Sequence, residues 1–61
     1  MLPIVQDALG RLDPRRRAIV VLHYLEGEPV ARVGKLLRIS PITVRWHLAR
    51  ARRQLAALLS E

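Results

Sequence analysis

The 61-residue chain contains no cysteine and only one tryptophan and one tyrosine. Without cysteine it can form neither a disulfide framework nor a thiolate metal site. No apolar run approaches the roughly 20 residues that a membrane-spanning helix requires. The first residues also lack the basic-then-apolar order of a secretory signal peptide. These absences predict a soluble, cytoplasmic protein with one small domain, residues 1–61.

Groups that carry catalysis are equally scarce. The sequence has no nucleophile–base arrangement, no paired carboxylates and no phosphate-binding loop, and a chain this short lacks the bulk for a substrate cleft. Its two histidines, His23 and His47, are too few for a metal site without cysteine. We therefore expect no enzyme activity, no cofactor and no metal. His47 is instead expected to pack against the core or to contact phosphate.

Positive charge is abundant and lies in the second half of the chain. From residue 1 to residue 28, four arginines are balanced by four acidic residues. Residues 29–61 contain seven basic residues and one acidic residue, so they carry the whole net charge of +6. A solvated basic face would account for part of this excess, but such segregation is typical of a surface that binds a polyanion.

Four prolines stand where helices can begin, and none of them interrupts an amphipathic run. Asp13–Pro14 is a strong start signal, and Gly27 supplies a left-handed stop. We predict an all-α fold with helices at about 3–11, 14–26, 29–37 and 41–59. The residues expected to face inward are Val5, Leu9, Leu12, Ala18, Ile19, Leu22, Leu25, Val30, Val33 and Leu37.

The last predicted helix has two different faces. Ser40 is a suitable N-cap and Pro41 suits the first helical position. One face is apolar at helical spacing and is expected to be buried; it consists of Val44, Leu48, Ala51, Leu55 and Leu58. The other face is rich in arginine around a single large aromatic, and consists of Ile42, Arg45, Trp46, Ala49, Arg50 and Arg53. This second face predicts an anionic partner, and the major groove of a DNA duplex is the leading candidate.

The third and fourth predicted helices have helix-turn-helix form. Gly34 lies in the middle of the third helix, where two crossing helices would approach closely and a Cβ would clash. Five apolar residues then supply contacts that fix the crossing: Val33, Leu37, Ile39, Val44 and Leu48. An ordinary three- or four-helix bundle is the alternative.

From Leu9 onward the sequence resembles the fourth domain of bacterial sigma factors of the extracytoplasmic-function type. The resemblance is carried by Arg17-Ala18, Leu22 to Gly27, Val33 to Leu37, Ile39 to Pro41, Thr43 to Arg45, Leu48, Arg50 to Arg52 and Leu55. The Tyr-Leu-Glu-Gly and Arg-Ala-Arg segments are the most specific to the family. Since chains of that family are much longer, we expect this one to be a domain excised from a longer sigma factor.

The resemblance implies that the domain binds the minus-thirty-five promoter element and docks on the β flap of RNA polymerase, with an anti-sigma factor as a further partner. The isolated domain is expected to be a monomer. The implied base-and-backbone contacts, with the outer-face residues beside them, are Ile42, Thr43, Arg45, Trp46, Ala49, Arg50 and Arg53. Further phosphate contacts are expected at Arg16, Arg32, Arg38, Ser40 and His47.

The chain departs from the family pattern at several positions. The family usually has an acidic residue at Arg32, glycine at Arg38 and Ile42, and a small polar residue at Trp46. A left-handed conformation at Arg38 would cost on the order of 1 kcal/mol. Trp46 could contact thymine methyl groups or cover a protein surface.

Two other interpretations stay open. A Thr-Val-x-x-His-Leu string at 43–48 is similar to the response-regulator type of helix-turn-helix domain, which binds DNA as a dimer. Alternatively, an apolar strip of Ile42, Trp46, Ala49 and Ala57 would dock on a protein.

Two residue groups outside the last helix also have two interpretations each. Arg15, Arg16 and Arg17 crowd the first turn of the second helix, where cations oppose the helix dipole. They either contact phosphate or are solvated. Tyr24 is expected to be semi-buried beside the partner-docking surface, or to be purely structural.

Overall fold

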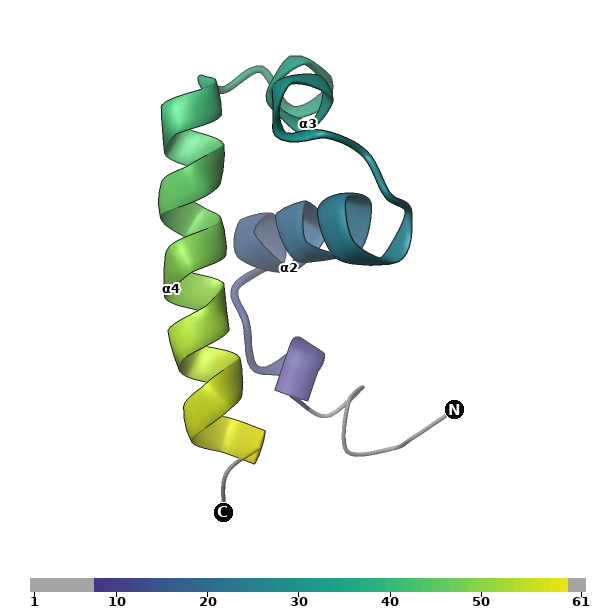
Figure 1. Cartoon of the computed structure of the whole chain (residues 1–61). Helices are drawn as coiled ribbons and strands as arrows, with labels where there is room; N and C mark the ends of the chain where they lie inside the picture. The colour runs from purple at the N-terminus through teal and green to yellow at the C-terminus, as the bar shows by residue number, and fades with distance from the viewer. Residues whose placement is uncertain (1–7, 60–61) are drawn as a thin grey trace.

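The computed structural model describes residues 8–59, in which the regular structure is helical and no strand occurs. Residues 8–10 are helical, and they are followed by α2 (Pro14–Val20), a π-helical segment η1 (Val21–Leu25), α3 (Val30–Leu37) and α4 (Pro41–Leu59). Figure 1 shows α4 along one side of the molecule, with α3 beside its N-terminal end and α2 across its middle. The predicted all-α fold is confirmed. Within residues 8–59, no helix is long and apolar enough to cross a membrane.

The predicted start of the second helix is confirmed in atomic detail. Asp13 has an extended backbone, and its Oδ1 accepts a hydrogen bond from the Arg16 backbone N–H at 2.9 Å. Pro14 occupies the first turn, where a backbone N–H would have no partner within the helix, so its missing N–H costs no hydrogen bond. Gly27 has a φ of 74°, as expected for a left-handed stop.

The end of this helix differs from the prediction at Leu25. From Val21 onward the helix widens into η1, and the Glu26 N–H donates to the Val21 carbonyl five residues back at 3.0 Å. The wider turn carries Leu25 off the face that Leu22 shares with the core. Leu25 is consequently 67% exposed, so the prediction that it faces inward is wrong.

The helix predicted at 3–11 lies partly outside the described residues, which exclude 3–7 and therefore Val5. Residues 8–10 are helical. Leu12 is buried and Leu9 packs beside it, as predicted.

The turn between α3 and α4 explains why position 34 is a glycine. α3 begins at Val30, one residue later than predicted, because Pro29 has an extended backbone and caps the helix with its carbonyl. A Cβ on Gly34 would lie 2.7 Å from the Ile39 carbonyl oxygen. The close approach is therefore to the backbone of the turn, rather than to the side of the crossing helix.

Two apolar clusters hold the helices together. The first joins Ile19, Val33, Val44 and Leu48, with Leu22, Val30, Leu37 and Ile39 packed against it. The second joins Leu12, Val20 and Ala51, with Leu9 and Leu55 packed against it. Both clusters use the predicted inner face of α4, so the opposite face of that helix is turned outward.

Candidate nucleic-acid interface

The start of α4 is fixed by hydrogen bonds to Ser40, the residue before it. The Ser40 Oγ accepts a hydrogen bond from the Thr43 backbone N–H at 3.1 Å and lies 2.9 Å from the Thr43 Oγ1. The Ser40 carbonyl accepts from the Val44 N–H at 3.0 Å. Ser40 is therefore the N-cap, as predicted. Because it fixes where α4 begins, it also determines which later side chains of the helix face the core and which face outward.

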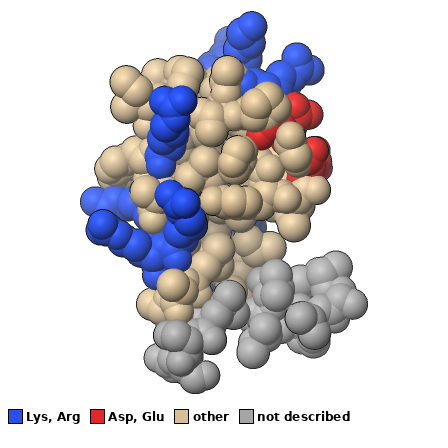
Figure 2. Space-filling view, in the orientation of Figure 1, with Lys and Arg blue, Asp and Glu red and all other residues tan. Residues whose placement is uncertain are grey.

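The inner and outer faces of α4 are those that its periodicity predicts. Val44 and Ala51 are fully buried, and Leu48 is 5% exposed. The outer face, exposed at every position, consists of Ile42, Arg45, Trp46, Ala49, Arg50 and Arg53. Figure 2 shows Lys and Arg side chains gathered along the α4 side and near α3, with the acidic groups on the other side of the view. The outer face of α4 is therefore a positively charged surface with few competing carboxylates.

Trp46 lies at the centre of this outer face and has two guanidinium groups near its ring. The Arg50 Cζ lies 4.6 Å from the indole centroid, and the Arg16 Cζ lies 5.6 Å from it. The His47 ring meets the indole edge-on at 5.0 Å. Trp46 is half exposed despite these neighbours, so the indole is both oriented and accessible.

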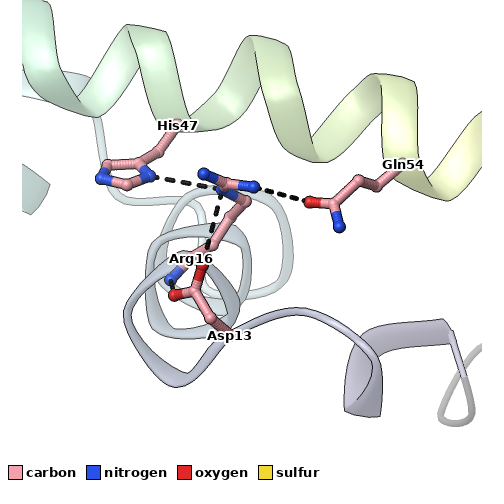
Figure 3. Close-up of polar contacts among 4 residues, drawn as sticks. All are labelled: Asp13, Arg16, His47 and Gln54. Atoms are coloured by element: carbon pink, nitrogen blue, oxygen red, sulfur yellow. Dashed lines mark hydrogen bonds and ion pairs between the residues drawn. The ribbon is translucent and has the colours of Figure 1, made fainter.

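Arg16 connects α2 to α4 (Figure 3). Its Nε donates to the His47 Nδ1 at 3.3 Å, and its Nη1 donates to the Gln54 Oε1 at 2.7 Å. Asp13 Oδ2 lies 4.0 Å from the same Nε. The Arg16 side chain is only 15% exposed. The interpretation of Arg16 as a solvated side chain is therefore wrong, because it bridges two helices.

The protonation of Asp13 and His47 follows from this arrangement. The backbone hydrogen bond from Arg16, with the nearby guanidinium, lowers the pKa of Asp13 below its usual 3.8. Partial burial, followed by the charge of Arg16, lowers the pKa of His47 below its usual 6.5. His47 is consequently neutral at pH 7, with Nδ1 free to accept from Arg16 and the proton on Nε2. His47 itself is partly buried, beside Arg16 and the Trp46 ring.

The other predicted phosphate contacts lie around the helix-turn-helix. Arg32 is exposed on α3, with its Nε 4.0 Å from the Glu28 Oε1. Arg38 is exposed in the turn, with a left-handed backbone (φ 60°, ψ 44°), and Ser40 is exposed at the start of α4. No group of three or more metal-ligating side chains occurs within residues 8–59.

Sequence reasoning found the outer face of α4 but missed Gln54 and the bridging role of Arg16. The partners of Arg16 are 31 and 38 residues away in the sequence. No local pattern connects them. The one available signal was the position of Arg16 three residues after Asp13, which is the spacing of a local ion pair.

Comparison with known proteins identifies the family. The family model described as "Sigma-70, region 4" matches residues 2–55. No curated protein and no solved structure matches the chain. Because the family match covers most of the chain and the structure has the helix-turn-helix form, the protein belongs to the sigma-70 region 4 family of DNA-binding transcription domains.

Proposed function

We propose that this chain is domain four of an extracytoplasmic-function-type sigma factor and binds the minus-thirty-five element of a promoter. The observation that carries the proposal is the outer face of α4, where exposed arginines surround a half-exposed tryptophan. α4 enters the major groove, where side chains can distinguish all four base pairs. The family match favours this function over a response-regulator domain.

The contacts divide into two groups. The residues proposed to meet bases or the adjacent backbone are Ile42, Thr43, Arg45, Trp46, Ala49, Arg50 and Arg53. Arg32, Arg38, Ser40 and His47 flank them and are proposed to contact phosphates, which fix the register of the helix without reading sequence. Arg16, also expected to contact phosphate, is assigned to neither group, because its side chain is only 15% exposed and two of its N–H groups already bind His47 and Gln54.

Salt dependence tests the DNA-binding proposal. If about five basic side chains neutralise phosphates, the logarithm of the association constant should fall with the logarithm of salt concentration with a slope of about −4.5. The measurement is a fluorescence-anisotropy titration of a labelled duplex at several salt concentrations. A neutral peptide-nucleic-acid duplex of the same sequence is the control and should not bind. A flat salt response with the DNA duplex would contradict the proposal.

The polymerase partner is proposed to dock on the side away from the outer face of α4. Three large apolar side chains are about half exposed or more: Tyr24 and Leu25 on η1, and Leu36 on α3. η1 lies at the end of α2 that is remote from α4 (Figure 1). Contacts there leave α4 free for DNA, so one domain can hold the β flap and the promoter together. This association would place the protein in the cytoplasm.

A protein-binding role for the outer face is the second candidate. Ile42 is 76% exposed, Trp46 is 50% exposed and Ala57 is exposed on the same helix. Aromatic residues flanked by arginine are common at the centres of protein interfaces. Gel filtration separates the candidates: a monomer that binds duplex DNA favours the promoter role, whereas self-association with no DNA binding favours the protein interface. An anti-sigma factor would then compete with DNA for the same face.

A further inference from the structure

Trp46 is the only tryptophan of the chain, and both a partly buried guanidinium and an exposed one lie near its ring. Arg16 approaches it from α2 and Arg50 from the next turn of α4. The two arginines have very different surroundings. Arg16 is 15% exposed and tied to neighbouring side chains, whereas Arg50 is exposed on the outer face.

The Arg16 guanidinium is held from three sides. His47 and Gln54, both on α4, accept hydrogen bonds from Nε and Nη1, and Asp13 lies 4.0 Å from Nε. Because a guanidinium is planar and rigid, these contacts fix its orientation as well as its position. Arg16 therefore offers the indole a positive group that cannot move independently of α4.

The Arg50 guanidinium lies over the same indole, with 4.6 Å between Cζ and the ring centroid. Helical side chains lean toward the N-terminus of their helix, so Arg50 covers the residue one turn before it. Stacking occupies the face of a guanidinium and leaves its N–H donors pointing outward around the edge. That edge matches the O6 and N7 acceptors of guanine in the major groove.

We propose that Trp46 and Arg50 act as one guanine-reading unit and that Arg16 is its positioning residue. Arg16 orients the indole, the indole orients the Arg50 guanidinium, and Arg50 donates two hydrogen bonds to guanine. This proposal deepens the proposed function and rests on it, because it requires that the outer face of α4 enters the major groove.

The first test is selection from a pool of duplexes that carry random positions between constant flanks, followed by sequencing of the bound fraction. Wild type should enrich sites that share a guanine at one position. Arg50→Ala should reduce the preference for guanine at that position by about 5- to 150-fold, which is the cost of losing one bidentate base contact. Arg16→Ala should reduce the same guanine preference by at least about twofold, as expected for residues that belong to one side-chain network. Its affinity for duplexes without the guanine should stay within about twofold of wild type.

Two control variants separate this effect from loss of charge. Arg15→Ala removes the same charge from an exposed neighbour on α2, and it should leave the guanine preference intact. Arg53→Ala should weaken binding to all duplexes alike and make the salt slope shallower by about one unit. If Arg15→Ala relaxes the preference as much as Arg16→Ala does, the positioning role is overturned.

A double-mutant cycle tests the route through the indole. In a Trp46→Ala background, Arg16→Ala should no longer change the guanine preference, because its effect passes through Trp46. An undiminished effect would overturn this route. If Arg16→Ala fails to fold, Gln54→Leu serves as the test in its place. It removes only one hydrogen-bond acceptor of Arg16 and should reduce the same guanine preference.

Fluorescence supplies a readout that does not depend on DNA. Since Trp46 is the only tryptophan, its quenching by acrylamide reports on this ring alone. Quenching should increase in Arg50→Ala and in Arg16→Ala while circular dichroism stays unchanged. Unchanged quenching in both variants would overturn the stacked arrangement.

The outcomes also distinguish this proposal from the one on which it rests. A chain that enriches no duplex overturns promoter binding and the guanine-reading unit together. Enrichment of a site that lacks guanine, or of one whose guanine survives Arg50→Ala, overturns only the guanine-reading unit.

Discussion

Replacing Arg38 with glycine should stabilise the domain. α3 ends with Arg38 at φ 60° and ψ 44°, and its N–H lies 3.4 Å from the Lys35 carbonyl, while the Ile39 N–H donates to the Gly34 carbonyl at 2.9 Å. This is the hydrogen-bond pattern of a Schellman motif, which usually has glycine at the left-handed position. A side chain there costs about 1–2 kcal/mol. Glycine removes that cost but makes the unfolded chain more flexible, which costs about 0.4–1 kcal/mol. The difference between these two costs is about 0–1.6 kcal/mol, so the free energy of unfolding should rise by on the order of 1 kcal/mol.

Thermal unfolding followed by circular dichroism measures this change. For a domain of this size, 1 kcal/mol corresponds to about 4–8 °C in Tm. Arg38→Ala is the matched control: it removes the same charge but keeps Cβ, so its Tm should stay close to that of wild type. Both variants should weaken DNA binding equally if Arg38 contacts a phosphate. A Tm that falls in Arg38→Gly, or rises equally in both variants, would refute backbone strain as the cause.

Three further changes have definite expected outcomes. Gly34→Ala should lower the free energy of unfolding by about 1–3 kcal/mol in urea titrations, because its Cβ would overlap the Ile39 carbonyl oxygen; unchanged stability would show that the turn can move aside. The contribution of His47 to stability should be constant above about pH 6.5 and should be lost as the pH drops below it, because the unfolded state then binds a proton that folded His47, with its lowered pKa, resists. His47→Gln should remove this pH dependence. If the pH dependence persists in that variant, it belongs to another titratable group. Leu25→Ser should change stability by no more than about 0.5 kcal/mol and should weaken pull-down of the polymerase β flap; full retention would exclude Leu25 from the docking surface.

The sequence was sufficient to predict α4 and its two faces, because local signals and tertiary packing agree there. Ser40 caps the helix through its hydroxyl, and Pro41 begins it. Val44, Leu48 and Ala51 then recur at helical spacing and all become buried. The opposite face is rich in arginine, and the polar face of such an amphipathic helix is expected to be exposed. The candidate DNA-reading face therefore follows from periodicity alone.

The same periodicity failed at the end of α2. It assumes 3.6 residues per turn, and η1 departs from that value, as the bond from the Glu26 N–H to the carbonyl of Val21 five residues back shows. Leu25 then leaves the buried stripe and joins Tyr24 among the exposed apolar residues. No residue in Val21–Leu25 is a recognisable sign of such widening, because all of them are tolerated in an ordinary helix.

Arg16 is unfavourable within its own helix, and its contacts with another helix compensate for this. A cation in the first turn of α2 opposes the helix dipole, which costs several tenths of a kcal/mol at an exposed site. Asp13 offsets part of this cost through the nearby carboxylate. The remaining compensation comes from His47 and Gln54, two residues on another helix that only the folded chain brings within reach. Arg16 thus links the N-terminus of α2 to the inner edge of α4, directly behind Trp46. A substitution in α2 can therefore alter the geometry of the outer face of α4 without itself touching DNA.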